Sequence, residues 1–262
     1  MRQGADITIK TALKAGVAAL AAVVGLAGAA SAQDQVVNVY NWSDYIAEDT
    51  IENFQKETGI TVRYDVFDSN EVLEAKMLAG NSGYDVVVPT STFLARQIQA
   101  GVFMELDKSK LPNWDNLDDT LLGRVEPMDP GNDHGMPYMW GTTGFAYNKK
   151  MIEERMPDAP TDSWDMMMDP EVVSKFADCG VTFLDAPTEV IPAALNYIGA
   201  DPAGQDSDKM EEAMAHMQKV RPHIKYFHSS QNINDLANGD ICIAMGWSGD
   251  EHVARPAHGD AD

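Results

Sequence analysis

The stretch that decides the fold is residues 36–101, VVNVYNWSDYIAEDTIENFQKETGITVRYDVFDSNEVLEAKMLAGNSGYDVVVPTSTFLARQIQAG. Runs rich in β-branched residues at 36–40, 60–67 and 85–89 indicate strands. Each run is followed by a pattern of helical period that stops at a glycine. Strands that alternate with helices in this way predict a mostly parallel, doubly wound sheet.

Three helices are expected in this stretch. The first covers residues 44–57, the second is capped by Ser69 and ends near Gly80, and the third opens at Ser91 or Thr92. A proline- and aspartate-rich connection without a sustained period follows at residues 112–135.

The alternation of strands and helices returns downstream of an extended, aromatic-rich segment at 136–147. We therefore predict an α/β protein with two lobes, each built on a doubly wound mixed sheet. The first lobe covers residues 33–141 and the second residues 142–262. The downstream strands are expected at 181–184, 224–227 and 241–245, and the helices at 189–198, 209–220 and 233–238.

The first 32 residues have the pattern of a secretory signal. Basic residues precede an apolar, alanine-rich stretch at 15–29, and Ala30-Ser31-Ala32 matches a cleavage site. The stretch is short and weakly apolar for a membrane anchor, which is the alternative. We expect a periplasmic protein, in a compartment that permits disulfides. Cys179 and Cys242, the two cysteines of the chain, are expected to pair, with two separate buried thiols as the alternative.

The charge balance limits the possible partners. The chain has 19 Lys and Arg against 41 Asp and Glu, a formal net charge of −22. Nucleic acids and anionic membranes need clustered basic residues, so neither is an expected partner. Cationic small molecules fit the sign of the charge.

The predicted strand ends gather one kind of chemistry. In open α/β sheets, ligands bind beyond the carboxyl ends of the strands. No Lys or Arg occurs at these ends, and aromatic faces with carboxylates suit an organic cation. Each residue also has a purely structural alternative, as a core aromatic, a helix cap or a turn. The residues at these ends include Trp42, Ser43, Asp44, Tyr45, Thr90, Asp185, Glu189, Ser229, Trp247 and Asp250.

Catalytic motifs are missing from the sequence. The histidines lack the spacing of a zinc site, and there is no nucleophile elbow, phosphate-binding loop or dinucleotide-binding turn. We expect neither an enzyme nor a cofactor or metal ion.

At these residues the sequence resembles the putrescine-binding proteins of bacterial polyamine ABC transporters, within the spermidine/putrescine-binding family. The resemblance extends from Val36 to Asp250, and Ser43-Asp44-Tyr45 is similar to the putrescine branch. Its longest segments are YNWSDYIAEDTIENFQKETGITVRYDVFDSNEVLEAKMLAG, YDVVVPTSTFLARQIQAGVF, MPYMWGTTGFAYN, CGVTFLDAPTEVIPAALNYIG and YFHSSQNINDLANGDICIAMGWSGD.

The resemblance implies a monomeric periplasmic receptor with the two-lobed fold of the type II periplasmic binding proteins. Such a receptor closes on putrescine and delivers it to a membrane permease. It also implies a disulfide between Cys179 and Cys242. Aromatic residues would enclose the aliphatic chain of the ligand, while carboxylates and hydroxyls would hold its ammonium ends. The implied ligand-binding residues are Trp42, Ser43, Asp44, Tyr45, Thr90, Glu189, Ser229, Trp247 and Asp250.

The chain departs from the family after Asp250. Family members continue well beyond residue 262, with a return crossover to the first lobe that helps to complete the site. We therefore expect a truncated or frame-shifted reading frame, or a gene fragment, that binds putrescine weakly or not at all. The alternatives are a receptor for another ligand, such as spermidine or a sugar, and a non-functional fragment.

Overall fold

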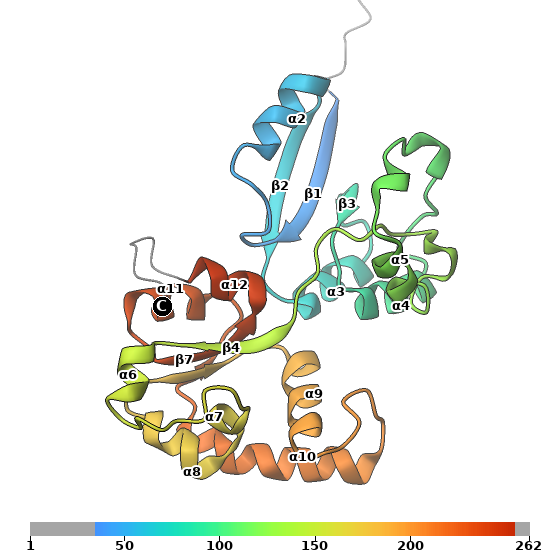
Figure 1. The fold of residues 1–262 in the computed structure, drawn as a ribbon. Helices are drawn as coiled ribbons and strands as arrows, with labels where there is room; N and C mark the ends of the chain where they lie inside the picture. The colour runs from blue at the N-terminus through green and yellow to red at the C-terminus, as the bar shows by residue number, and fades with distance from the viewer. Residues whose placement is uncertain (1–34, 255–262) are drawn as a thin grey trace, which may run out of the picture.

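The computed structural model describes residues 35–254, so the predicted signal segment lies outside the described residues. Two separate sheets organise this part of the chain (Figure 1). The first contains β1 (Val36–Trp42), β2 (Thr61–Phe67) and β3 (Val86–Val87) in the order β2-β1-β3. Its described strands are all parallel, as the β/α alternation predicts, whereas the mixed pairing expected for both lobes occurs in the second sheet.

The register of the first sheet brings two loops together. β1 pairs with β2 from Val36 opposite Thr61 to Trp42 opposite Phe67. Because the strands are parallel, their carboxyl ends meet at one edge, and the residues that follow Trp42 and Phe67 lie side by side.

Three helices accompany this sheet: α2 (Thr50–Thr58), α3 (Asn70–Leu78) and α4 (Ser91–Gln99). The cap of α3 is confirmed, since the Ser69 side chain accepts a hydrogen bond from the Val72 N–H at 3.3 Å. The helix expected from residue 44 begins only at Thr50. Asp44 has a φ of 64°, a left-handed conformation that a helix cannot contain, so residues 43–49 form a loop instead.

The connection between the sheets has local structure that its irregular sequence did not predict. It contains α5 (Asp119–Val125), whose first turn is capped by the Asp118 side chain, and short 3-10 turns. Asp129 is fully buried and accepts hydrogen bonds from the backbone of His134 and Gly135, both at 2.9 Å. Burial opposes ionisation of Asp129, but these bonds and the His134 ring outweigh it and lower its pKa.

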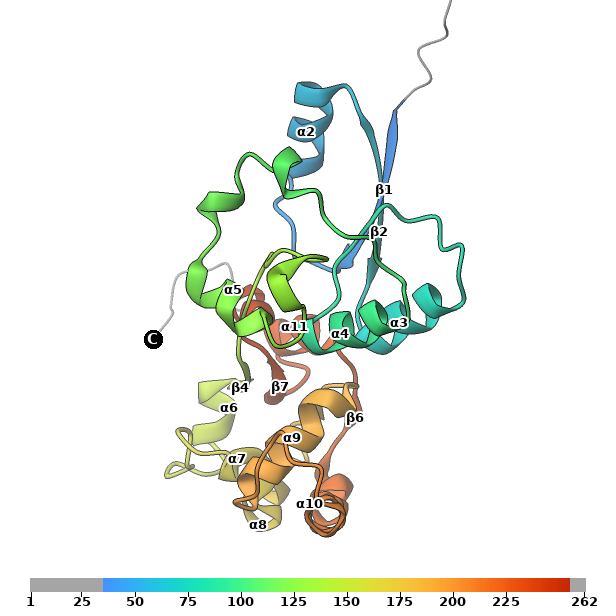
Figure 2. The same cartoon turned by 90° about the vertical axis from the view of Figure 1, so that its right-hand side faces the viewer.

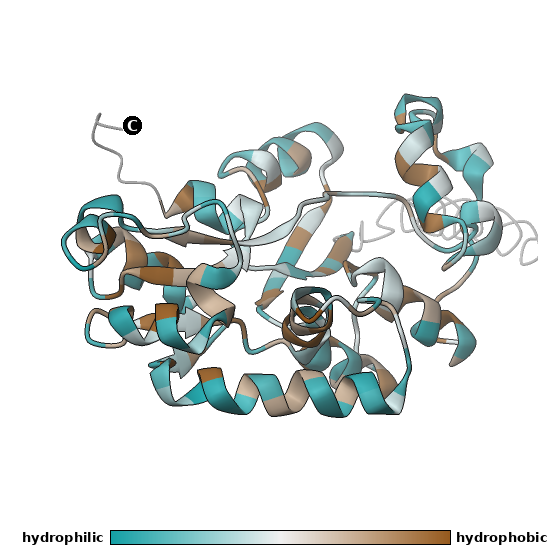
Figure 3. Ribbon diagram, turned by 60° about the horizontal axis from the view of Figure 1, so that its bottom comes forward, coloured by the Kyte–Doolittle hydropathy of each residue, from teal (hydrophilic) through white to brown (hydrophobic). Residues whose placement is uncertain are grey.

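The second sheet contains β4 (Thr143–Tyr147), β5 (Val181–Phe183), β6 (Tyr226–Phe227) and β7 (Ile243–Trp247) in the order β4-β7-β5-β6. β4 runs antiparallel to β7, and the other pairs are parallel. Helices lie around this sheet (Figure 2), and they carry both hydrophilic and hydrophobic residues (Figure 3). They are α6 (Lys149–Glu153), α7 (Asp165–Met168), α8 (Pro170–Val173), α9 (Pro187–Tyr197), α10 (Ser207–Val220), α11 (Gln231–Asn238) and α12 (Ser248–Val253).

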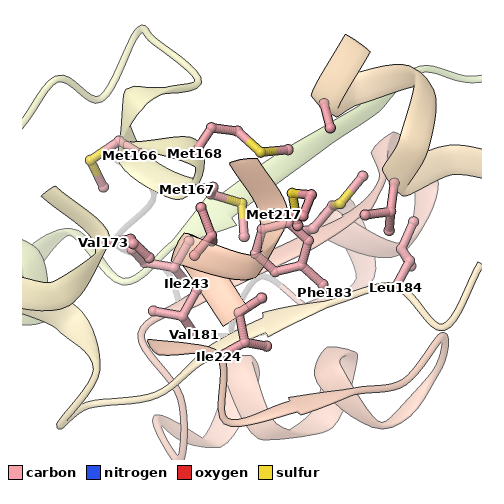
Figure 4. Close-up of a cluster of buried hydrophobic side chains, with 14 of the residues drawn as sticks. Met166, Met167, Met168, Val173, Val181, Phe183, Leu184, Met217, Ile224 and Ile243 are labelled. Atoms are coloured by element: carbon pink, nitrogen blue, oxygen red, sulfur yellow. The ribbon is translucent and has the colours of Figure 1, made fainter. Parts of the chain in front are cut away.

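The larger hydrophobic core belongs to the second sheet. Met166, Met167 and Met168 are completely buried there with Phe183 and Ile243 (Figure 4). The first sheet has a much smaller core, formed by Tyr40, Phe67 and Leu73. Several of its apolar side chains, including Val66 and Val86, are about half exposed.

The expected disulfide is confirmed. Cys179 and Cys242 are bonded, with their Cα atoms 5.5 Å apart. Cys179 lies two residues before β5, and Cys242 lies directly before β7. Among residues 35–254, no helix has the length and apolar character needed to cross a bilayer.

Candidate functional site

A hollow lies between the carboxyl ends of the two sheets. Seven of the nine side chains predicted for the ligand line it. The complete lining consists of Trp42, Ser43, Asp44, Tyr45, Asp68, Ser229, Ser230, Ile233, Trp247 and Asp250. Because the first five come from the first sheet and the last five from the second, the hollow depends on how the sheets face each other.

The wall from the first sheet is fixed by bonds between neighbouring strand ends. Ser43 donates from its backbone N–H, at 2.9 Å, and from its hydroxyl, at 3.1 Å, to the Phe67 carbonyl. The indole of Trp42 donates to the Val88 carbonyl at 2.8 Å. The loop after β1 is therefore tied to the ends of both β2 and β3, which holds its side chains at the hollow.

Aromatic rings from both sheets meet in the hollow. Trp42 and Trp247 pack edge to face with their ring centroids 5.5 Å apart and an interplanar angle of 72°. The ring of Tyr45 stands edge-on to Trp42 at 6.4 Å. These rings provide the π faces that attract organic cations.

Asp250 is the buried carboxylate of the site. It lies in the first turn of α12 and is 5% exposed. Burial raises its pKa to about 6, an effect that a hydrogen bond with Tyr45 opposes and the charge of Asp44 reinforces. A buried carboxylate without a basic partner is costly, and a bound cation would remove that cost.

Tyr45 connects Asp250 to the first sheet. Burial and the neighbouring Asp250 carboxylate raise the pKa of the Tyr45 phenol, so it stays a neutral hydrogen-bond donor. The backbone carbonyl of Tyr45 accepts a hydrogen bond from the Tyr138 hydroxyl. Gly249 faces the ring, and a Cβ atom at that position would lie 3.4 Å from it. The first turn of α12 is thus packed directly on Tyr45.

Ser229 has unused hydrogen-bonding capacity. It is 6% exposed, and the described residues offer its Oγ no hydrogen-bond partner. Native proteins rarely leave such a buried hydroxyl without a partner, and a polar ligand group in the hollow would supply one.

Two predicted residues lie outside the lining. Thr90 is exposed at the start of α4, where its backbone N–H donates to the Asn70 side chain at 3.0 Å. Glu189, on α9, accepts a hydrogen bond from the Thr143 hydroxyl at 2.6 Å. Thr143 pairs with Trp247, a residue of the lining, between β4 and β7. Glu189 therefore contacts a neighbour of the lining and is not part of the lining itself. Their roles in ligand binding remain predictions.

Asp68, Ser230 and Ile233 also line the hollow, although they are not among the predicted ligand-binding residues. Asp68 follows directly after β2 and satisfies the same strand-end rule that identified the other residues, so it was detectable. Ser230 is the residue directly before α11 and Ile233 is the third residue of that helix, so both depend on where the helix begins.

The charge of the hollow has one sign. Its lining includes three carboxylates, on Asp44, Asp68 and Asp250, and no Lys, Arg or His. Beside Asp250, burial and the charge of Asp250 raise the pKa of Glu251 to about 8. Anionic ligands would need a cationic partner here, whereas ammonium groups would find several acceptors. Within residues 35–254, no group of three or more metal-ligating side chains is present.

Comparison with known proteins agrees with this geometry. The chain is 56% identical to the putrescine-binding periplasmic protein SpuD of Pseudomonas aeruginosa over 239 residues, 90% of this chain and 65% of SpuD. It is also 56% identical to the putrescine-binding periplasmic protein PotF of Escherichia coli over 225 residues, 85% of this chain and 61% of PotF. The chain thus spans less than two thirds of the length of these relatives.

Solved structures show the same fold. A Listeria monocytogenes protein assigned to a spermidine/putrescine ABC transporter matches with a TM-score of 0.73 and 31% identity, over 82% of this chain and 63% of that one. The Tp0655 lipoprotein of Treponema pallidum matches with a TM-score of 0.72 and 26% identity, over 85% and 67%. Residues 49–261 match the bacterial extracellular solute-binding proteins. The resemblance is therefore confirmed, and the chain belongs to the bacterial extracellular solute-binding protein family.

Proposed function

We propose that this chain is a receptor for a small organic dication, putrescine, and that it delivers this ligand to an ABC transporter permease. The observation that carries the proposal is Asp250, a buried carboxylate in a hollow lined by three acids, three aromatic rings and no basic residue. The names of SpuD and PotF, which describe binding of putrescine in the periplasm, support it.

In the proposed complex, one ammonium group lies at Asp250 and hydrogen-bonds to the Ser229 hydroxyl. The tryptophans flank the aliphatic chain. Their present centroid separation of 5.5 Å leaves no space for a methylene chain between them. Two van der Waals contacts need about 7 Å, so binding requires the rings to move apart. The sheets that carry them therefore shift slightly when ligand enters.

The remaining parts of the proposal follow from the sequence. We propose cleavage of the signal after residue 32 and release into the periplasm. We also propose lobes at 33–141 and 142–262, a division supported by the first sheet ending at Val87 and the second beginning at Thr143. Thr90 and Glu189 would join the site only after such a movement. The protein acts as a receptor without catalysing a reaction on its ligand.

The proposal is tested by calorimetry on the purified chain at pH 7.5 with putrescine, spermidine, glutamate and glucose. We expect saturable binding of putrescine and no heat with glutamate, because the lining offers no basic residue to a carboxylate ligand. Glucose is the probe for the sugar alternative. Tighter binding of glucose or glutamate than of putrescine, or no response to either amine at millimolar concentration, would contradict the proposal.

A further inference from the structure

We propose that His228 is a positioning residue that fixes one side of the hollow by capping α11 with its imidazole. This inference rests on the proposed function, because the residues that it positions are those offered to the ligand. His228 does not line the hollow itself. Its effect on binding would act through Ser229, Ser230 and Ile233.

The geometry of the cap is clear. His228 follows β6, and its backbone N–H donates to the Phe183 carbonyl of β5 at 2.9 Å, which anchors the residue to the sheet. Its ring Nδ1 accepts hydrogen bonds from the backbone N–H of Ser230 at 3.1 Å and of Gln231 at 3.0 Å. The chain therefore closes a short loop between the end of the sheet and the start of α11.

This cap replaces the usual one. The first N–H groups of a helix lack partners within the helix, and a Ser at the N-cap position normally supplies an oxygen. Ser230 occupies that position but makes no side-chain cap bond. Because Nδ1 of His228 accepts two backbone bonds, the ring proton lies on Nε2. The ring thus acts as Asn or Asp side chains do when they accept from backbone groups two and three residues ahead.

The loop that the cap closes contains Ser229, which lines the hollow. Ser229 lies between the anchored residue and the bonded amides. It lines the hollow together with Ser230 and Ile233, and its buried Oγ has no hydrogen-bond partner among the described residues. A hydroxyl held in place before the ligand arrives loses less conformational entropy on binding. Without the cap, Ser229 would sample several positions, and the affinity for an amine would fall.

The rest of α11 has other supports. Asp235 accepts a hydrogen bond from the Tyr226 hydroxyl at 2.6 Å, and the buried Asn232 side chain donates to the Met245 carbonyl at 3.5 Å. Loss of the cap should therefore free the first turn and leave the helix and the sheet in place. Substitutions of His228 can therefore test the cap without unfolding the protein.

Two substitutions of His228 distinguish the effect of its hydrogen-bond acceptor from the effect of its ring. His228→Asn keeps an acceptor at the same number of bonds from Cα and removes the ring, whereas His228→Phe keeps a ring and removes the acceptor. We expect His228→Asn to bind putrescine within about threefold of the unchanged chain, and His228→Phe to bind about tenfold more weakly. His228→Ala, which lacks both, should resemble His228→Phe. Thermal unfolding identifies any variant that fails to fold.

A second measurement needs no ligand. Amide hydrogen exchange should show Ser230 and Gln231 protected in the unchanged chain and in His228→Asn, and exposed in His228→Phe and His228→Ala. The inference is overturned if affinity or protection follows the ring instead of the acceptor, or if all variants behave alike. If the unchanged chain binds no amine, the proposed function fails, and the exchange data show whether the cap exists without it.

Discussion

The indole rings of Trp42 and Trp247 meet edge to face with their centroids 5.5 Å apart, although they belong to different sheets. Trp42 ends β1 and is held by its bond to the Val88 carbonyl, while Trp247 ends β7 and precedes α12. Each ring lies where a strand delivers its last side chain. The contact therefore joins the two sheets at the position where the ligand is proposed to bind.

This contact should contribute measurably to stability. In a double-mutant cycle with Trp42→Ala and Trp247→Ala, we expect a coupling free energy of about 0.5–1.5 kcal/mol from urea unfolding without ligand. Trp114, which makes no ring contact with Trp247, provides the control pair and should show no coupling. A coupling of zero for Trp42 and Trp247 would mean that the rings do not meet in solution.

Asp250 should dominate the affinity for diamines. Asp250→Asn removes the buried charge but keeps the shape of the side chain, so calorimetry should show putrescine affinity reduced by at least about tenfold. Asp158→Asn is the matched control, because Asp158 is an exposed carboxylate outside the lining. A response to glucose, if present, should change less. Equal losses for both ligands would point to a structural role for Asp250.

The same residue should make binding depend on pH. The carboxylate that attracts the ammonium group forms as pH rises through its pKa of about 6. Between pH 7.5 and pH 5, putrescine affinity should therefore fall by about tenfold, and this slope should disappear in Asp250→Asn. A slope that persists in the variant would assign the pH dependence to another group.

Glu251 should make stability fall with rising pH. Burial raises its pKa from 4.5 to about 8, so the folded state holds a proton that the unfolded chain has already released above pH 4.5. The contribution of this proton to the free energy of unfolding is complete below pH 4.5, the pKa of Glu251 in the unfolded chain, and is lost as pH approaches 8. From pH 6 to pH 8, urea unfolding should show the free energy of unfolding falling by about 1–2 kcal/mol. Glu251→Gln should flatten this slope, while Glu211→Gln, an exposed control, should retain it.

The disulfide between Cys179 and Cys242 should be a major stabilising element of the second sheet. It spans 63 residues of sequence. Closing a loop of this length contributes up to about 4 kcal/mol on the chain-entropy view. Adding a reductant during unfolding experiments should lower the free energy of unfolding by about 2–4 kcal/mol. The variant with both cysteines changed to Ala should have this lower free energy of unfolding without reductant, and adding reductant should not change it.

Much of the fold followed from local patterns. The strands of the first sheet, the Ser69 cap and the paired cysteines were all predicted because hydrophobic period, capping chemistry and compartment act over short distances or on residue type alone. α2 was misplaced at its start, since Asp44 adopts a left-handed conformation in a loop fixed by Phe67 across the sheet. A periodic pattern contains no information about that bond.

The sequence by itself determined which residues stand at the strand ends, because parallel strands deliver their last side chains to one edge whatever surrounds them. Only the tertiary structure decided which ends face each other. It brought Asp68 into the lining, left Thr90 and Glu189 outside it, and buried Asp250 beside Tyr45. Burial and long-range contact depend on how two sheets pack, and the charge state of Asp250 follows from that packing.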